Sequence, residues 1–402
     1  MKANMLKTLK NNPLILPIYA PTLLLAFSRG LLIPILPLYV RDFGASYGLI
    51  GMVLAAQQFG MLVADMPAGV LLRQLGRKRA MMVGLLTLIT TTILLFWARS
   101  VYEAMALRFV SGLGMSLFNI ARHLYLAEAV KQTTRGRAIA LYGGINRIGT
   151  FLGPAVGGAA AAAYGLRLPF LLYGVAGGTA VILTLIFVTR TGAVIPGETQ
   201  KHGLLNTIKT HYRLLAAAGT AQLFAQTVRA GRNVIIPLIG ADVLGLDVQA
   251  IGTIISAAAA VDMTLFYPAG WVMDRFGRKF AIVPSFLIQA TGMALLPLAT
   301  GFTTLLMITC LIGFGNGVGS GTMMTLGADL APTATRSEFL GTWRFIGDGG
   351  FTLGPIIVGG VADLLVLQTA ALFLAGSGIL AGLIFARFVP ETLKRHDMQI
   401  AD

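Results

Sequence analysis

The chain has 402 residues, of which 56% are hydrophobic and only 12% are charged. Soluble globular domains carry about 25% charged residues, so this composition excludes an ordinary soluble protein. The net charge of +15 does not indicate binding to nucleic acid, because the basic residues lie mostly in short connections between long apolar segments. The composition therefore predicts an all-α membrane protein.

Apolar segments of about 20 residues or more recur along the whole chain, and each is long enough to cross a bilayer as a helix. We predict twelve such helices, at residues 14–40, 47–72, 80–98, 102–127, 138–163, 168–189, 214–240, 249–273, 280–299, 303–328, 339–363 and 367–389. Lys and Arg are frequent in every second connection, whereas the alternate connections hold only Arg41, Arg99 and Arg167. Because basic loops stay on the cytoplasmic side, both termini are predicted to be cytoplasmic.

The second half of the chain repeats features of the first half. A glycine-rich, basic group recurs 201 residues later, with Gly69, Gly76 and Arg77 matching Gly270, Gly277 and Arg278. Such a repeat in an apolar chain is typical of transporters built from two related helical bundles. We predict an N-terminal six-helix bundle at 1–190, a cytoplasmic linker loop at 191–212 and a C-terminal six-helix bundle at 213–402.

The repeated group lies in the loop after the second predicted helix and in the equivalent loop after the eighth. The second copy is complete, with Gly270, Asp274, Arg275, Gly277, Arg278 and Lys279. It resembles the Gly-x-x-x-Asp-Arg-x-Gly-Arg-Lys signature of the major facilitator superfamily, in which this loop braces the outward-facing state. The resemblance implies two pseudo-symmetric six-helix bundles around a central cavity. In the first copy Arg73 and Gln74 replace the Asp and Arg, which removes the anionic partner from that half.

The fifth predicted helix narrows the resemblance to one branch of this family. It matches the signature of the drug/proton antiporters at Gly149, Gly153, Pro154, Gly157 and Gly158. The eleventh helix carries a looser copy at Gly354 and Pro355. A Gly-Pro pair bends a helix, and the flanking glycines allow close packing against a neighbouring helix. The resemblance implies proton-coupled efflux, as in multidrug resistance.

Arginines inside the predicted helices are costly in a bilayer, so each requires an anionic partner or a water-filled cavity. Arg29 and Arg229 occupy repeat-equivalent positions, each about two helical turns before a matched proline. Two facing arginines would clamp a carboxylate or phosphate, as in organophosphate transporters of this fold. The alternative is that they gate the two halves by pairing with acidic residues or helix ends. The other candidate substrate-binding residues are Arg122, Arg232, Asn119 and Asn233.

Three acidic residues inside the predicted helices are candidates for proton coupling. Asp262 ranks first, Asp348 second and Asp65 third, and each is equally compatible with a purely structural ion pair. A carboxylate that moves between apolar surroundings and an arginine changes its affinity for a proton. Arg108 begins a segment that resembles the fourth-helix motif Arg-x-x-x-Gly-x-Gly of the family, whose arginine is linked to proton transfer.

These features predict a secondary active transporter that expels a small organic solute, anionic or amphiphilic, in exchange for protons by alternating access. The alternatives are uptake or exchange of an anionic metabolite such as a carboxylate or an organophosphate, and a non-transporting sensor or scaffold with the same fold. The sequence offers no metal-ligand spacing or catalytic constellation, so we expect no enzyme and no cofactor, with a proton gradient as the energy source. We expect a monomer in the cell membrane, with the solute and the lipid bilayer as its partners.

Overall fold

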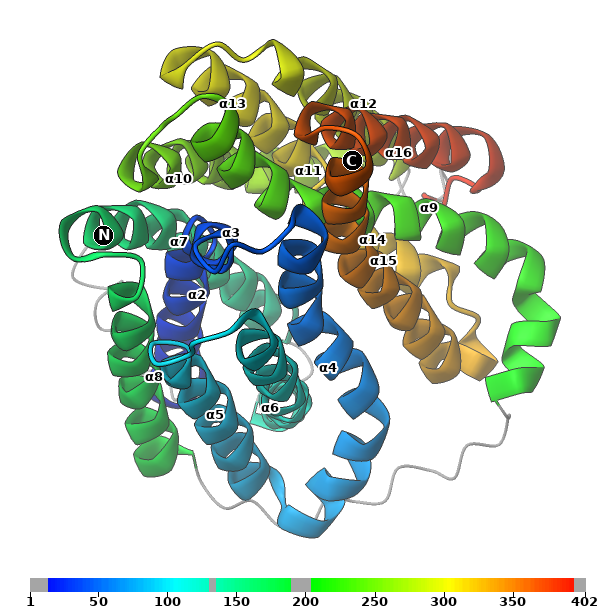
Figure 1. Ribbon diagram of the computed structural model, residues 1–402. Coiled ribbons are helices and arrows are strands. Elements are labelled where there is room, and N and C mark those ends of the chain that lie inside the picture. The colour runs from blue at the N-terminus through cyan, green and yellow to red at the C-terminus, as the bar shows by residue number, and fades with distance from the viewer. Residues whose placement is uncertain (1–13, 130–134, 189–203, 394–402) are drawn as a thin grey trace, which may run out of the picture. The chain divides into compact units, whose positions relative to one another are not determined.

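The computed structural model describes residues 14–129, 135–188 and 204–393, and these residues form helices with no strand among them (Figure 1). The helices of the first half are α2 (Ala20–Leu32), α3 (Ile35–Arg41), α4 (Tyr47–Leu75), α5 (Arg77–Leu94), α6 (Val101–Ala129), α7 (Arg135–Tyr164) and α8 (Leu168–Phe187). The helices of the second half are α9 (Leu204–Leu238), α10 (Val248–Thr264), α11 (Phe266–Phe276), α12 (Lys279–Leu295), α13 (Phe302–Val318), α14 (Thr322–Leu330), α15 (Arg336–Leu364) and α16 (Leu367–Phe388).

The predicted all-α membrane fold is confirmed. Each of the twelve predicted segments coincides with one helix or with consecutive helices, and a π-helical turn at Ile15–Tyr19 precedes α2. In the described residues, 9 helical stretches are long and apolar enough to cross a membrane. Large apolar side chains also point outward, and Val175 and Ile186 on α8 are 71% and 64% exposed. Such a surface would be a liability in water, whereas it suits lipid.

Three of the predicted segments are interrupted by a break in the helix. Between α2 and α3, Pro34 and Pro37 lack the N–H groups that would continue the backbone ladder. Pro268 has the same effect between α10 and α11, since it cannot donate to the carbonyl of the residue four earlier. Between α13 and α14 the chain turns at Gly321, whose φ of 76° is left-handed. Sequence periodicity did not predict these breaks, because both sides of each one are apolar.

Close packing divides the chain into two units, residues 1–196 with 246–256, and residues 197–245 with 257–402. In the first unit α2 packs against α7 and α8, and α6 packs against α4 and α5. In the second unit α9 packs against α15 and α16, and α12 packs against α13 and α16. The repeat-equivalent pairs α2 with α7 and α9 with α15 therefore pack in the same way. Of the predicted linker at 191–212, residues 191–203 lie outside the described residues. Helix α9 begins at Leu204.

The two copies of the loop motif form the same turn. Gly76 ends α4 with a φ of 73°, and Gly277 ends α11 with a φ of 115°. Each glycine donates its N–H to the carbonyl four residues earlier, and the next helix begins within two residues. Residues with a side chain rarely adopt this conformation, which explains why glycine recurs at the same place in both halves.

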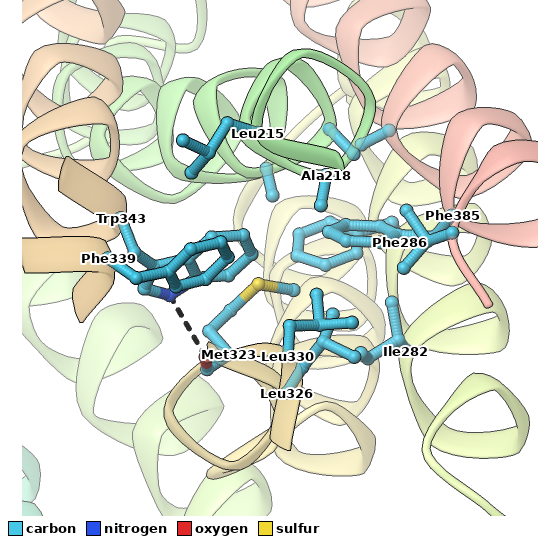
Figure 2. Packing of buried hydrophobic residues seen from close by; sticks show 14 residues of the cluster. Leu215, Ala218, Ile282, Phe286, Met323, Leu326, Leu330, Phe339, Trp343 and Phe385 are labelled. Atoms are coloured by element: carbon cyan, nitrogen blue, oxygen red, sulfur yellow. Dashed lines mark hydrogen bonds between the residues drawn. The ribbon is translucent and has the colours of Figure 1, made fainter. Parts of the chain in front are cut away.

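The second unit has a compact aromatic core at the junction of α9, α12, α14, α15 and α16 (Figure 2). The rings of Phe286 on α12 and Phe385 on α16 are stacked, with centroids 6.1 Å apart. Trp343 on α15 donates its indole N–H to the carbonyl of Met323 on α14 at 3.2 Å. Because the buried indole has its hydrogen bond, this core fixes α14 against α15 without an unsatisfied donor.

Candidate functional site

Arg29 on α2 extends into the first unit toward α7. Its Nη2 donates to Oδ1 of Asn146 at 2.7 Å, and its Nε is buried without a hydrogen-bond partner among the described residues. It forms no ion pair with a carboxylate in that part of the chain. A neutral amide oxygen therefore orients this cation. The sequence did not predict this contact, because 117 residues separate Asn146 from Arg29 and no motif connects them.

Arg122 on α6 is also held by neutral groups. Its side chain is only 4% exposed, and its Nη2 donates to Oδ1 of Asn119 at 2.8 Å. The guanidinium carbon lies 4.8 Å from the centre of the Phe118 ring and 4.9 Å from that of Tyr142. The two rings fix the guanidinium through cation–π contacts. Two of the predicted residues, Arg122 and Asn119, are thus in direct contact, and the aromatic rings of Phe118 and Tyr142 are additional members of the site.

The remaining predicted residues of the first unit lie on α4 and α6. The hydroxyl of Ser116 on α6 donates to Oδ1 of Asp65 on α4 in a short hydrogen bond. Arg108 lies further toward the beginning of α6, with its Nε buried and without a hydrogen-bond partner among the described residues. One carboxylate oxygen of Asp65 therefore has a hydrogen-bond donor from the neighbouring helix. Asp65 and Arg108 both remain candidates for proton coupling.

Arg229 on α9 contacts the end of a helix in the second unit. Its Nη2 donates to the carbonyl of Gly319, the C-cap of α13, at 3.3 Å, and its Nη1 donates to Oε1 of Gln226 at 3.4 Å. The guanidinium also lies 5.3 Å from the centre of the Phe286 ring. A cation at a helix C-terminus is favourable because the last carbonyls carry partial negative charge. This contact is of the kind expected if Arg229 pairs with a helix end.

The other predicted residues of the second unit lie on α9, α10 and α15. Arg232 and Asn233 are half-buried on α9, and Asp262 is half-buried on α10 with its Oδ1 atom inaccessible. Asp348 on α15 lies 3.5 Å from the Nε of Arg344, one turn earlier in the same helix. Asp348 therefore has a cation of its own helix beside it, which lowers the cost of keeping it charged.

Arg278 of the second loop motif is the centre of an ionic network at the start of α12. Its Nε lies 2.9 Å from Oδ2 of Asp329 on α14, while Oδ1 of Asp274 is 3.6 Å from its Nη1. Asp274 is 80% exposed, so its contribution is screened by solvent. Asp329 is the closer and more buried partner, and it also accepts from the hydroxyl of Thr392 at 2.8 Å.

Glu391, just after α16, joins the same network. Its carboxylate accepts hydrogen bonds from the backbone N–H groups of Arg278 at 2.9 Å and Lys279 at 3.0 Å. Burial raises the pKa of Glu391, but the N–H groups of Leu393, Lys279, Arg278 and Thr392 together lower it below its ordinary value. The residues after the last helix are thereby fastened to the loop motif that precedes α12.

Replacing Glu391 with glutamine is expected to lower the melting temperature of the protein at pH 7. Because the folded state lowers the pKa of Glu391, its stabilisation is present above the ordinary value of 4.5 and is lost as the pH falls through the lower, folded value. The difference in melting temperature between the wild type and Glu391→Gln should therefore shrink below pH 4.5. Asp42→Asn, at an exposed ion pair with Arg41, is the control and should show little difference at either pH. An undiminished difference at low pH would contradict this account.

The remaining residues of the two loop motifs include two glycines and two arginines, Gly69, Gly270, Arg77 and Arg275. Gly69 and Gly270 would have open space around an added Cβ atom, so close packing does not explain why either is glycine. Arg77 is 6% exposed at the start of α5, whereas Arg275 is exposed and lies over the ring of Trp271 at 5.5 Å. Arg275 has no equivalent cation in the first copy, where Gln74 occupies the matching position, whereas Arg77 and its equivalent Arg278 are both largely buried.

The glycines of α7 form one packing face. A Cβ atom added at Gly149, Gly153 or Gly157 would lie within 3.0 Å of the backbone of α2. Gly158 faces the start of α10 instead, and an added Cβ would lie 2.6 Å from the carbonyl oxygen of Val248. Pro154 lies inside α7, and Pro355 lies inside α15. In the equivalent pair, a Cβ added at Gly354 of α15 would lie 2.6 Å from the carbonyl oxygen of Thr227 on α9.

A serine from α10 lies inside the backbone ladder of α7. The hydroxyl of Ser256 accepts from the N–H of Ala155 at 2.8 Å and donates to the carbonyl of Phe151 at 2.7 Å. A regular α-helix joins these two groups directly. Insertion of a side chain at this place is a recognised cause of helix bending, and it occurs beside Pro154.

Within the described residues no group of three His, Cys, Asp or Glu side chains is arranged to hold a metal ion. The polar groups described above are instead arginines, amides and single carboxylates on membrane helices. They suit binding and release of a polar solute or a proton, and they form no nucleophile-base constellation.

Comparison with known proteins places this geometry in a family. The model of the Major Facilitator Superfamily matches residues 20–226 and 218–400. An uncharacterized MFS-type transporter of Methanocaldococcus jannaschii is 22% identical over 88% of this chain and 92% of its own length. Quinolone resistance protein NorA of Staphylococcus aureus is 22% identical over 93% of this chain and 95% of its own length. Multidrug resistance protein 2 of Bacillus subtilis is 23% identical over 70% of this chain and 72% of its own length.

Solved structures agree with this assignment at the level of the fold. The peptide transporter POT, in complex with sulfate, has a TM-score of 0.76 at 15% identity and covers 94% of both chains. The nucleoside transporter NupG has a TM-score of 0.74 at 14% identity and covers 94% of this chain and 100% of its own. The family match, its relatives and its fold together establish that the chain belongs to the Major Facilitator Superfamily of membrane transporters.

Proposed function

We propose that the chain is a secondary active transporter that expels a small organic solute in exchange for protons by alternating access. The glycine face of α7 around Pro154 carries this proposal, because it matches the drug/proton antiporter signature. Two relatives, named for quinolone resistance and multidrug resistance, support export of the solute, at 22% and 23% identity. As a member of a transporter family, the chain is not an enzyme.

Proton coupling in this proposal rests on the membrane carboxylates. Asp262, Asp348 and Asp65 are the candidate carriers, with Arg108 as a cation that acts on them. A carboxylate can bind a proton in one state of the cycle and lose it in the other when its surroundings change between apolar and cationic. No cofactor takes part in this scheme, and the proton gradient supplies the energy.

The proposal also includes a location and an orientation. The protein would lie in the cell membrane as a monomer, with both termini cytoplasmic, since basic residues favour the cytoplasmic loops. The candidate solute-binding side chains are Arg29, Arg122 and Asn119 in the first unit, and Arg229, Arg232 and Asn233 in the second unit. A transport cycle would expose them to each side of the membrane in turn.

The second candidate function is uptake or exchange of an anionic metabolite. It is favoured by the buried cations of the first unit, where Arg29, Arg108 and Arg122 form no ion pair with a described carboxylate. A carboxylate or an organophosphate would supply the missing charge. A non-transporting sensor or scaffold is the third candidate, and it is disfavoured because a scaffold gains nothing from buried unpaired cations.

Transport can be tested with purified protein in liposomes that contain a pH-sensitive dye. Solutes should include quinolones, an amphiphilic cation, a carboxylate and an organophosphate, each added with and without an imposed pH gradient. We expect solutes of one class to move in the direction opposite to protons, so that the internal pH changes when such a solute is added. Protein-free liposomes are the control. Solute movement in the same direction as protons would support uptake instead, and absence of flux with every class from folded protein would contradict transport.

A further inference from the structure

We propose that the first unit contains an oxyanion-binding site in which Arg29 of α2 and Arg122 of α6 converge on one face of α7. Its ligand is the carboxylate or phosphate group of an organic anion with an apolar body. The inference deepens the proposed transport function by naming the substrate class, and it depends on that function for its biological meaning. The anion is recognised here by Arg29 and Arg122 of one unit, in place of the pair Arg29 and Arg229 that was considered from the sequence.

The two arginines meet through neighbouring residues of α7. Arg29 donates to Asn146, and Arg122 lies over the ring of Tyr142. These two residues of α7 are four positions apart, so they lie one turn apart on the same face, about 6 Å along the axis. One anion can therefore reach both groups.

The positive charge of this pair is not neutralised within the described residues. Each guanidinium donates a hydrogen bond to a side chain of the described residues, and in both cases the acceptor is a neutral amide oxygen. The Nε atoms of Arg29 and Arg122 are buried and have no hydrogen-bond partner there. Asp65, a carboxylate of the same unit, accepts a hydrogen bond from Ser116 instead. Ser116 precedes Arg122 by six residues, or about 9 Å along α6. Buried charged donors left without an anion are unfavourable, so the site is completed by an external one.

The neighbouring groups indicate what kind of anion fits. Guanidinium groups donate parallel hydrogen bonds to carboxylate and phosphate oxygens. The rings of Phe118 and Tyr142 hold the Arg122 guanidinium in place and present apolar surface beside it. Asn119 and Asn146 fix the two cations from the side, which reduces the ordering that a ligand must impose. This combination suits an aromatic or aliphatic acid better than a bare inorganic ion.

The test is equilibrium binding to the full-length protein in phosphatidylcholine nanodiscs, without any gradient. Benzoate and phenyl phosphate are the anionic probes, and tetraphenylphosphonium is the cationic probe. We expect both anions to bind, and Arg29→Gln and Arg122→Gln each to weaken them about tenfold or more, since charge-assisted hydrogen bonds are lost. Affinity for the cation should not fall. Arg41→Gln, at an exposed arginine beside Asp42, is the matched control and should bind like the wild type.

A second variant protects the test against loss of folding. Asn146→Asp keeps the shape of the side chain and places a carboxylate beside Arg29, in the position of the proposed ligand. We expect a higher melting temperature, weaker binding of benzoate, and loss of the stabilisation that benzoate gives the wild type. If Asn146 is only a structural partner of Arg29, the variant should bind benzoate as the wild type does.

The outcomes separate this inference from the proposed function. Benzoate binding that survives in both arginine variants, or an Asn146→Asp variant with unchanged benzoate affinity, would overturn the anion site. A protein that moves cations against protons but does not bind either anion would also overturn it, while leaving proton-coupled efflux intact. Anion binding that depends on both arginines, in a protein that moves no solute in liposomes, would support the site and contradict the transport proposal.

Discussion

A single methyl group added at Gly153 is expected to destabilise the first unit strongly. The Cβ atom of Gly153→Ala would lie 2.5 Å from the Cα atom of Gly30 and 2.6 Å from the carbonyl oxygen of Phe27, both on α2. These are backbone atoms, so no side chain can rotate away and the two helices must separate. Overpacking of this kind costs about 1–3 kcal/mol and occasionally more. Loss of the α2–α7 contact should lower the melting temperature and the yield of monodisperse protein.

Gly144→Ala is the matched control for this prediction. It lies on the same helix, and nothing is within 4 Å of its added Cβ atom. Because alanine favours a helix over glycine by about 0.5–1 kcal/mol, this variant should melt at the wild-type temperature or above it. Thermal unfolding curves of Gly153→Ala and Gly144→Ala, recorded in the same detergent, test the prediction. Equal melting temperatures for the two variants would show that α2 and α7 are not in direct backbone contact.

Replacing Asp262 with asparagine is expected to abolish proton-coupled flux. Asp262 lies on α10 with one carboxylate oxygen inaccessible, and 12 positions in the sequence separate it from the loop motif at Asp274. Asparagine has nearly the same shape but cannot bind and release a proton. Solute-induced pH change in liposomes should fall to the level of protein-free vesicles. Exchange of labelled for unlabelled solute, which requires no net proton movement, should continue.

Asp247→Asn controls for the loss of a carboxylate at the start of the same segment. Asp247 is exposed before α10, where its Oδ1 accepts from the N–H of Ala250 at 2.7 Å. Asparagine caps a helix about as well as aspartate, so the fold should be kept. Proton flux of this variant should match the wild type. Loss of solute exchange as well as proton flux in Asp262→Asn would point to a structural ion pair in place of a proton carrier.

Apolar length was enough to predict where the membrane helices lie. Each predicted segment, from 14–40 to 367–389, coincides with helix, because a bilayer requires long apolar runs and helix satisfies their backbone groups. The breaks at Pro34 and Gly321 could not be predicted in this way, since the hydrophobic pattern continues through both. Glycines of α7 were predicted to pack closely, but the sequence did not say that α2 is their partner.

The candidate site was predicted residue by residue but not as a set of contacts. Arg29 and Arg122 were both selected because charge inside a membrane helix is costly. Their partners Asn146 and Tyr142 are ordinary neutral residues, which carry no comparable signal in a single sequence. In the second loop motif Arg278 has Asp274 within the motif as one partner, whereas the closer carboxylate belongs to Asp329, 51 residues later, which no sequence pattern indicates.

The hydroxyl of Ser256 allows α7 an exchange of hydrogen bonds that leaves their number unchanged. In the described structure it forms two hydrogen bonds, one to the N–H of Ala155 and one to the carbonyl of Phe151. If it withdraws, those two backbone groups can bond each other, and the hydroxyl can bond the carbonyl of Gly252, one turn earlier in its own helix. Two bonds are broken and two are made. Pro154 lacks an N–H in every conformation, whereas the hydroxyl of Ser256 can leave and return, so α7 can change shape at this place without a net loss of hydrogen bonds.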